Sequence, residues 1–143
     1  MCAVSEHAMS LILALERRLP EACDNQAKRV WRGMISDLSL REDELGGKTL
    51  IAIGLGAIGS RLARLARAFD MRAIVVKRDP SSGGTDADSV HSVVELTNLL
   101  PQPDFVALTC PLTPETENAD RCARTLRDEG ISLSGQCGSW RMR

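Results

Sequence analysis

The feature that most constrains the fold is the glycine-rich segment Leu50–Ser60. It opens with an apolar run, which leads directly into a turn containing Gly54, Gly56 and Gly59. The residues that follow, as far as Phe69, carry apolar side chains at helical spacing. This order predicts a buried strand, a tight turn and the start of a helix, as in a dinucleotide-binding βαβ unit. The alternative is a glycine turn in another kind of α/β protein.

Each of the three glycines has a separate physical role in such a turn. Gly54 permits the sharp turn, Gly56 lets the backbone approach a pyrophosphate, and Gly59 lets the helix pack closely on the strand. The phosphates then lie over the unpaired N–H groups at the positive end of the helix dipole. We therefore expect these glycines to bind the cofactor.

Length and composition restrict the class of protein. A chain of 143 residues with 43% hydrophobic residues is long enough for one domain with a core. A net charge of −1 gives no electrostatic reason to expect nucleic acid or an anionic membrane as a partner. No apolar run is long enough to cross a bilayer, and no basic region precedes the first one as in a signal peptide.

The cysteines predict a reducing compartment. They are odd in number and form no Cys-x-x-Cys pair. We therefore expect reduced thiols in a cytoplasmic protein, with neither a disulfide framework nor a metal site. The five are Cys2, Cys23, Cys110, Cys122 and Cys137.

Two helices are expected before the glycine turn. Residues Val4–Arg18 are nearly all apolar in their middle, which predicts a helix that packs against the sheet or another subunit. Pro20 suits the first turn of a second helix, which would run to about Arg32. Trp31 is expected to be a packing anchor rather than a platform for a ligand.

Two further buried strands are expected after the glycine turn, at Arg72–Val76 and Asp104–Thr109. A loop and then a short helix, Val90–Leu100, would separate them. The fold class is thus α/β, a partial Rossmann-type doubly wound parallel sheet of βαβαβ order. Long helices precede the sheet and an irregular C-terminal tail follows it. Residues 1–47 form the leading segment, 48–118 the Rossmann core and 119–143 the tail.

From Ala3 to about Asn118, the chain resembles the NAD(P)-binding domain of the D-isomer-specific 2-hydroxyacid dehydrogenases. This family includes phosphoglycerate, glyoxylate/hydroxypyruvate and formate dehydrogenases. Four segments carry the resemblance in the family's order, and the last is its long LLP…D…P-L-T-P-E-T segment: Ala3–Leu15, Leu45–Leu50, Gly54–Gly59 and Leu99–Thr116. The resemblance implies a nicotinamide dinucleotide as cofactor and a family-like homodimer through the first helix.

The resemblance also implies roles for residues around the turn. Ala57 and Ile58 would contribute backbone contacts to the pyrophosphate. Cys110, followed by Pro111, would lie beside the adenine–ribose part of the cofactor. The alternative for Cys110 is a small buried filler without direct contact.

The end of the second strand differs from the NAD pattern. An acidic residue is expected there to bind the ribose 2′-hydroxyl. This chain has Lys77 and Arg78 instead, and Asp79 comes two positions late. Two cations suit a 2′-phosphate, so we expect NADP to be accepted, with NAD as the alternative cofactor. In the other interpretation both cations are solvated and Asp79 reaches the ribose.

The family's catalytic residues are not found in this sequence. Hydride transfer to a 2-keto acid uses an arginine that binds the substrate carboxylate and a histidine assisted by a glutamate. The resemblance places all three after the P-L-T-P-E-T segment. The two histidines, His7 and His91, lie before it, and His91 has no carboxylate at a telling spacing. We assign catalysis to neither of them.

A shift of the reading frame after Asn118 would explain why the family's catalytic residues are not found. Read one nucleotide later, codons for Gln136–Arg143 are compatible with Val-Asn-Val-Gly-Arg-Gly-Gly, which contains the family's catalytic-arginine motif. Codons for Ala119–Ala123 can likewise encode Leu-Ile-Gly-Ala, the family's next segment. We hypothesise a frameshift near Asn118 and expect a chain truncated at both ends relative to the family.

Three functions follow from these observations. The chain is the cofactor-binding part of an oxidoreductase that transfers a hydride between a nicotinamide and a 2-hydroxy or 2-keto acid. Alternatively it is a non-catalytic module that binds a nucleotide or dimerises, or it is a decayed gene product. The 2-hydroxy acid would be a partner only if the missing regions completed the site.

Overall fold

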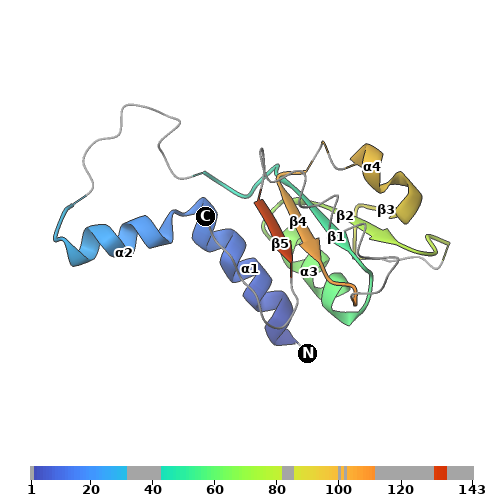
Figure 1. Cartoon of the computed structure of the whole chain (residues 1–143), viewed down its shortest axis with the longest axis horizontal. Helices are drawn as coiled ribbons and strands as arrows, with labels where there is room; N and C mark the ends of the chain where they lie inside the picture. Colours follow the sequence, from blue (N-terminus) through green and yellow to red (C-terminus); the bar gives the residue numbers. More distant parts are fainter. Residues whose placement is uncertain are drawn as a thin grey trace.

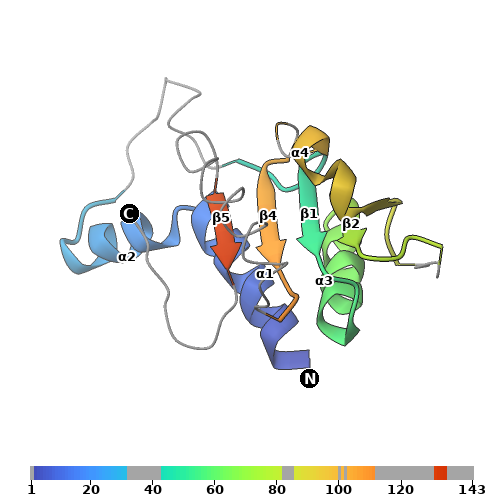
Figure 2. The ribbon, with the colours of Figure 1, turned by 45° about the vertical axis from the view of Figure 1, so that its right-hand side comes forward.

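A computed structural model describes residues 2–31, 43–81, 86–99, 101, 103–111 and 131–134. In this part of the chain, five parallel strands form one sheet in the order β3-β2-β1-β4-β5 (Figures 1 and 2). The expected α/β class and parallel sheet are confirmed. The strands are β1 (Thr49–Ile53), β2 (Arg72–Lys77), β3 (Ser89–Ser92), β4 (Phe105–Leu108) and β5 (Ile131–Ser134). The helices are α1 (Cys2–Glu16), α2 (Leu19–Ala27), α3 (Ala57–Ala68), the short 3₁₀-helix η2 (Val93–Glu95) and α4 (Leu96–Leu99).

The central strands are buried on both faces because alternate residues point to opposite sides of the sheet. In β1, Leu50 and Ala52 join a core cluster with residues of α1 and α3. Ile51 and Ile53 join a second cluster, which includes Leu96 of α4. The apolar run before the glycine turn is therefore continuous because both of its faces are covered.

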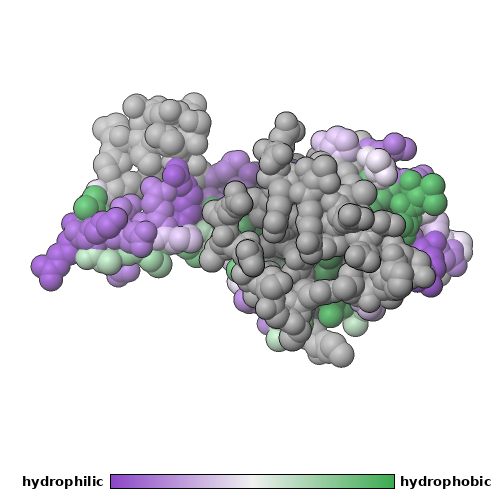
Figure 3. Space-filling model, viewed as in Figure 1, coloured by the Kyte–Doolittle hydropathy of each residue, from purple (hydrophilic) through white to green (hydrophobic). Residues whose placement is uncertain are grey.

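The two leading helices differ in how they pack. On α1, Ser5, Met9 and Ile12 are buried, and the helix packs against α3. No residue of α2 is buried, and the helix projects away from the sheet (Figure 1). Its surface is largely hydrophilic where it extends to the left in Figure 3.

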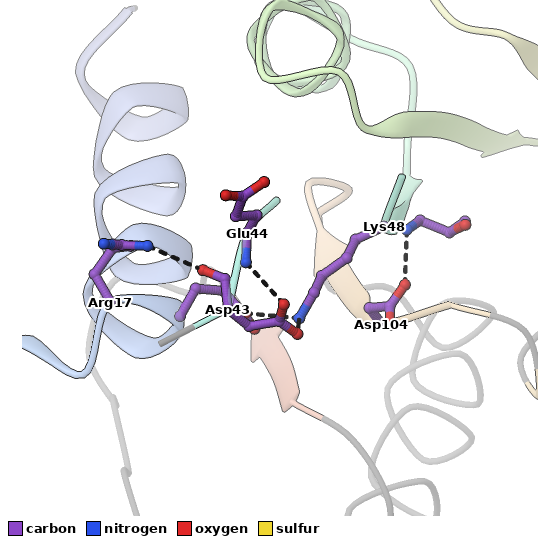
Figure 4. Close-up of polar contacts among 7 residues, drawn as sticks. Arg17, Asp43, Glu44, Lys48 and Asp104 are labelled. Atoms are coloured by element: carbon purple, nitrogen blue, oxygen red, sulfur yellow. Dashed lines mark hydrogen bonds and ion pairs between the residues drawn. The ribbon is translucent and has the colours of Figure 1, made fainter. Parts of the chain in front are cut away.

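The Lys48 cluster, which consists of Glu16, Asp43 and Lys48, ties α1 to the start of β1. Lys48 Nζ lies 2.6 Å from Glu16 Oε2 and 2.7 Å from Asp43 Oδ2 (Figure 4). Burial opposes the charge of Lys48, but its hydrogen bonds to the two carboxylates outweigh this effect and raise its pKa. The hydrogen bond from Lys48 lowers the pKa of Asp43. The cluster lies at the amino ends of the strands, opposite the glycine turn.

Two aspartates satisfy backbone N–H groups at this same edge. Asp104 Oδ2 accepts a hydrogen bond of 2.7 Å from the N–H of Thr49, at the start of β1 (Figure 4). Asp88 Oδ2 accepts one of the same length from the N–H of Ala73 in β2. Asp104 directly precedes β4, and Asp88 directly precedes β3. Each carboxylate accepts a hydrogen bond from the backbone of the neighbouring strand and so links two adjacent strands.

The structure corrects the expected helix at Val90–Leu100. Its first part is strand β3, which pairs with β2 from Ile74 opposite Ser89 to Lys77 opposite Ser92. Helical structure begins only at Val93. The polar residues of β3 break the apolar run that identifies central strands, since an edge strand is not buried on both sides.

The tail also contains a strand where irregular structure was expected. Residues Ile131–Ser134 form β5, which runs parallel to β4 with Phe105 opposite Ile131. This segment alternates apolar and serine residues, the period of a strand, but it is too short to stand out in the sequence.

The second helix ends at Ala27, whereas we expected it to run to about Arg32. Arg32 itself lies outside the described residues. The expectation that Trp31 is a packing anchor is wrong for the described part of the chain, because 93% of this residue is exposed. No helix in the described ranges is long and apolar enough to span a bilayer.

Candidate functional site

The site lies at the point where the direction of strand addition reverses. From β1 the chain adds β2 and then β3 on one side, and it returns to add β4 on the other side of β1. The carboxyl ends of β1 and β4 are therefore adjacent, and the loops that leave them diverge. In open α/β sheets, ligands bind in the crevice at this switch point.

Gly54 makes the turn that leaves β1. Its φ of +107° lies in the region that favours glycine. A Cβ on Gly54 would lie 2.9 Å from the backbone nitrogen of Cys110 and 3.0 Å from its Cβ. The turn is fixed on the other side by a 2.8 Å hydrogen bond from the N–H of Gly54 to the carbonyl of Val76 in β2.

Gly59 and Gly56 have opposite surroundings. A Cβ on Gly59 would collide with the carbonyl oxygen of Gly54 and lie 2.9 Å from Thr109 Oγ1. Gly59 therefore lets α3 pack directly on the turn. A Cβ on Gly56 would have no atom of the described residues within 4 Å. Glycine at this position is not explained by packing, and its open side is where a ligand can approach the backbone.

The N-terminus of α3 is presented at the same place. Gly56 is its N-cap residue and has no side chain to accept the first N–H groups, which belong to Ala57, Ile58 and Gly59. The position of this helix end is held from α1, because the buried Ser5 donates a 3.0 Å hydrogen bond to the carbonyl of Ile58. The first N–H groups of α3 therefore have no side-chain cap, and the hydrogen bond from Ser5 fixes the position of this helix end.

Thr109 links the carboxyl end of β4 to the glycine turn. Its Oγ1 lies 2.7 Å from the carbonyl oxygen of Gly54 and 3.1 Å from that of Ile53. Its N–H donates a 2.9 Å hydrogen bond to Ile53. Sequence reasoning did not single out this residue, although a hydroxyl directly after a buried strand that ends at the ligand edge was a usable signal. The next two residues, Cys110 and Pro111, are half-buried and exposed.

The end of β2 carries the two expected cations. Lys77 is the last residue of β2 and half-buried, and Arg78 is exposed. Val76 lies opposite Ile53 in the sheet, so this strand end is next to the glycine turn.

The acidic residue at this strand end is already engaged. Asp79 accepts hydrogen bonds from Ser81, 2.6 Å from its Oγ and 3.0 Å from its N–H. These hydrogen bonds, with a smaller effect from the charge of Lys77, lower the pKa of Asp79. Its carboxylate thus closes a local turn of the loop.

Neither histidine lies on the glycine turn or on the strands that flank β1. His7 is exposed on α1. His91 lies on β3, which is separated from β1 by β2. The expectation that His91 has no carboxylate partner is wrong, because its Nδ1 lies 3.3 Å from Glu95 Oε2. Glu95 follows His91 by four residues, a spacing that already indicated a possible pair in the sequence.

Of the expected site residues, the structure brings together those of the turn, of the α3 N-terminus and of the end of β4, with the end of β2 beside them. These residues are Gly54, Gly56, Ala57, Ile58, Gly59, Cys110, Pro111, Lys77 and Arg78. The carboxyl ends of β1, β2 and β4 and the N-terminus of α3 thus lie at one edge of the sheet.

Comparison with known proteins identifies the relatives of this arrangement. The family described as "D-isomer specific 2-hydroxyacid dehydrogenase, NAD binding domain" matches residues 9–124. A D-3-phosphoglycerate dehydrogenase of Synechocystis is 34% identical over 81% of this chain and 20% of its own length. A hydroxypyruvate reductase of Thermotoga maritima is 35% identical over 81% of this chain and 35% of its own.

Solved structures agree with these relatives. The apo-structure of D-lactate dehydrogenase from Escherichia coli superposes with a TM-score of 0.75 at 27% identity, covering 93% of this chain and 41% of that one. The TT0316 protein of Thermus thermophilus gives a TM-score of 0.74 at 30% identity, with the same two coverages. This chain spans between about a fifth and about two fifths of the length of these four proteins.

Proposed function

This chain belongs to the D-isomer specific 2-hydroxyacid dehydrogenase family, in which it represents the NAD-binding domain, and on that premise we propose that it binds its nicotinamide dinucleotide at the glycine turn. The pyrophosphate lies on the open side of Gly56 and accepts hydrogen bonds from the N–H groups of Ala57 and Ile58. Cys110 and Pro111 line the adenosine side. The observation that carries this proposal is the space around Gly56, because no packing contact among the described residues requires a glycine there.

We further propose that the site accepts NADP. Lys77 and Arg78 stand at the strand end next to the turn, where a cation can pair with a 2′-phosphate. The competing interpretation needs Asp79 to accept hydrogen bonds from the ribose. The hydrogen bonds from Ser81 to this carboxylate count against it.

Calorimetric titration with NADPH and NADH tests this proposal. We expect Lys77→Ala to weaken NADPH binding by about tenfold, or about 1.4 kcal/mol, and to leave NADH binding nearly unchanged. Arg72→Ala is the matched control, because Arg72 is an exposed cation at the opposite end of the same strand. Equal affinities for the two nucleotides, both unaffected by Lys77→Ala, would overturn the NADP proposal.

The reaction of the complete family member is the second part of the proposal. It is hydride transfer between the nicotinamide and a 2-hydroxy or 2-keto acid, in a cytoplasmic enzyme. We propose that this chain performs only the cofactor-binding part, because a shifted frame in residues 119–143 would remove the Asn-x-x-Arg-Gly motif. We also propose the division into residues 1–47, 48–118 and 119–143, in which the last segment is read in a shifted frame.

The coding DNA tests the frameshift. We expect its shifted frame after Asn118 to encode a Leu-Ile-Gly-Ala segment and then Asn-x-x-Arg-Gly. A chain made with the frame restored supplies the catalytic arginine, whereas the present chain should show no reduction of 2-keto acids above background. A shifted frame without Asn-x-x-Arg-Gly would refute the frameshift. Turnover of 2-keto acids by the present chain would refute the proposal that it performs only the cofactor-binding part.

A homodimer through the leading helices is a second candidate function. In α1 and α2, Val4 and Leu19 are each 48% exposed, and α2 buries no residue within the described chain. A partner that covers these side chains removes apolar surface from water. Light scattering should then give twice the chain mass of 15.5 kDa. The mass of a single chain at all concentrations would exclude this candidate.

A further inference from the structure

A second set of reactive side chains lies on the edge strand β3, which β2 separates from the strand of the glycine turn. Ser89 and His91 are two residues apart on this strand and share one face of the sheet. The Nε2 atom of His91 lies 3.2 Å from Ser89 Oγ. Its other ring nitrogen, Nδ1, lies 3.3 Å from Glu95 Oε2. The three side chains therefore form a continuous serine–histidine–glutamate array.

The carboxylate of Glu95 is held in place independently of His91. The backbone N–H of Ser92 donates a 3.0 Å hydrogen bond to Glu95 Oε2, as part of a capping box at the start of η2. This hydrogen bond, together with that from His91, lowers the pKa of Glu95. An ionised carboxylate can only accept hydrogen bonds.

The ionised carboxylate determines which ring nitrogen of His91 carries the proton. Since Glu95 accepts, Nδ1 of His91 must donate, and in the neutral ring Nε2 is then an acceptor. Ser89 consequently donates its hydroxyl hydrogen to Nε2. This is the arrangement in which a histidine can take the proton of a serine nucleophile.

We propose that Ser89 is a nucleophile, activated by His91 and Glu95, that reacts with small carboxylic esters. Ser89 Oγ bonds to the ester carbonyl carbon while His91 Nε2 takes the hydroxyl proton. The alcohol leaves with that proton, and water then hydrolyses the acyl-serine with His91 as the base. The side chain of His91 is 30% exposed and that of Glu95 54%, so the array is open to small substrates from solvent.

A fluorophosphonate probe tests the nucleophile on the full chain. Ser89 Oγ would bond to phosphorus as fluoride leaves, and the proton would pass to His91. Mass spectrometry of wild-type peptides compares Ser89 with Ser81, whose hydroxyl donates to Asp79 without an imidazole. We expect the adduct on Ser89, its loss in Ser89→Ala, a decrease in labelling rate of about 100-fold in His91→Gln, and no change in Ser81→Ala. p-Nitrophenyl acetate hydrolysis should follow the same order.

The positioning role of Glu95 has a spectroscopic test. Glu95→Gln keeps an acceptor for the capping box but removes the charge. Nitrogen-15 spectra should show the Nδ1–H tautomer of His91 in the wild type and a shift toward Nε2–H in Glu95→Gln, with slower labelling of Ser89. Equal labelling of Ser89 and Ser81 in the wild type, labelling that is unaffected by His91→Gln, or an Nε2–H tautomer in the wild type would each overturn the proposal.

Discussion

At Gly59, one methyl group decides whether α3 can pack on the glycine turn. We expect Gly59→Ala to destabilise the fold by about 1–3 kcal/mol, although alanine is the better helix former, because its Cβ meets the backbone oxygen of Gly54. Urea unfolding measures the change. Gly46→Ala is the matched control, since a Cβ there meets nothing within 4 Å, and we expect a change within about 0.5 kcal/mol. Equal losses in the two variants would contradict the packing role of Gly59.

Single residues were predictable where one conformation or contact requires one residue type. The spacing of Gly54, Gly56 and Gly59 indicated their separate roles, and the positive φ of Gly54 and the close contact of Gly59 agree with those roles. Thr109 was missed because a hydroxyl after a strand has many uses, and its contact with Gly54 joins residues 55 positions apart. Such long-range contacts leave no local pattern.

Among the elements, α1 depends on the Lys48 cluster for its attachment to the sheet. In Lys48→Met, Glu16 would lose its cation although its side chain is only 11% exposed. We expect a loss of about 1–3 kcal/mol in unfolding free energy, measured by urea unfolding. Arg17→Met is the control, since within the described residues this side chain makes an exposed 3.3 Å contact with the Asp43 carbonyl, and it should be nearly neutral. A neutral Lys48→Met would show that α1 does not need the cluster.

The same cluster sets a pH dependence for the attachment of α1. The pKa of Lys48 is raised on folding, so its stabilisation is present below the ordinary lysine pKa and is lost above about pH 10. The pKa of Asp43 is lowered, so its contribution is present above the ordinary aspartate pKa and is lost in acid, below about pH 4. Wild type and Lys48→Met should therefore differ most in stability between these limits. A constant difference at all pH values would contradict this.

The central elements were predictable and the edge elements were not. β1, β2 and β4 are buried on both faces and so appear in the sequence as apolar runs. β3 and β5 lie at the two edges of the sheet and contain serines and a histidine. A search for continuous apolar runs therefore does not identify them as strands. The extent of α2 was overestimated because helical propensity continues past Ala27, whereas no residue of this helix is buried in the described chain.

For the whole molecule, the family resemblance supplied what residue patterns could not. Apolar periodicity indicated strands and helices in order, but not that β4 returns to the far side of β1. That return creates the switch point at which Gly54 meets Cys110. The frameshift hypothesis for the tail comes from back-translation of its residues and from the family resemblance, and only the DNA can test it.

The most direct test of nucleotide binding at the glycine turn is the affinity of Gly56→Ala for NADPH, measured by calorimetry beside the wild type. A Cβ at Gly56 meets no atom within 4 Å in the described part of the chain, and its φ of −95° suits alanine, so the fold should keep its stability within about 1 kcal/mol. The methyl group would occupy the space of the pyrophosphate, and we expect at least about tenfold weaker binding, or about 1.4 kcal/mol. Unchanged affinity in Gly56→Ala, or no binding by the folded wild type, would contradict the proposed cofactor site.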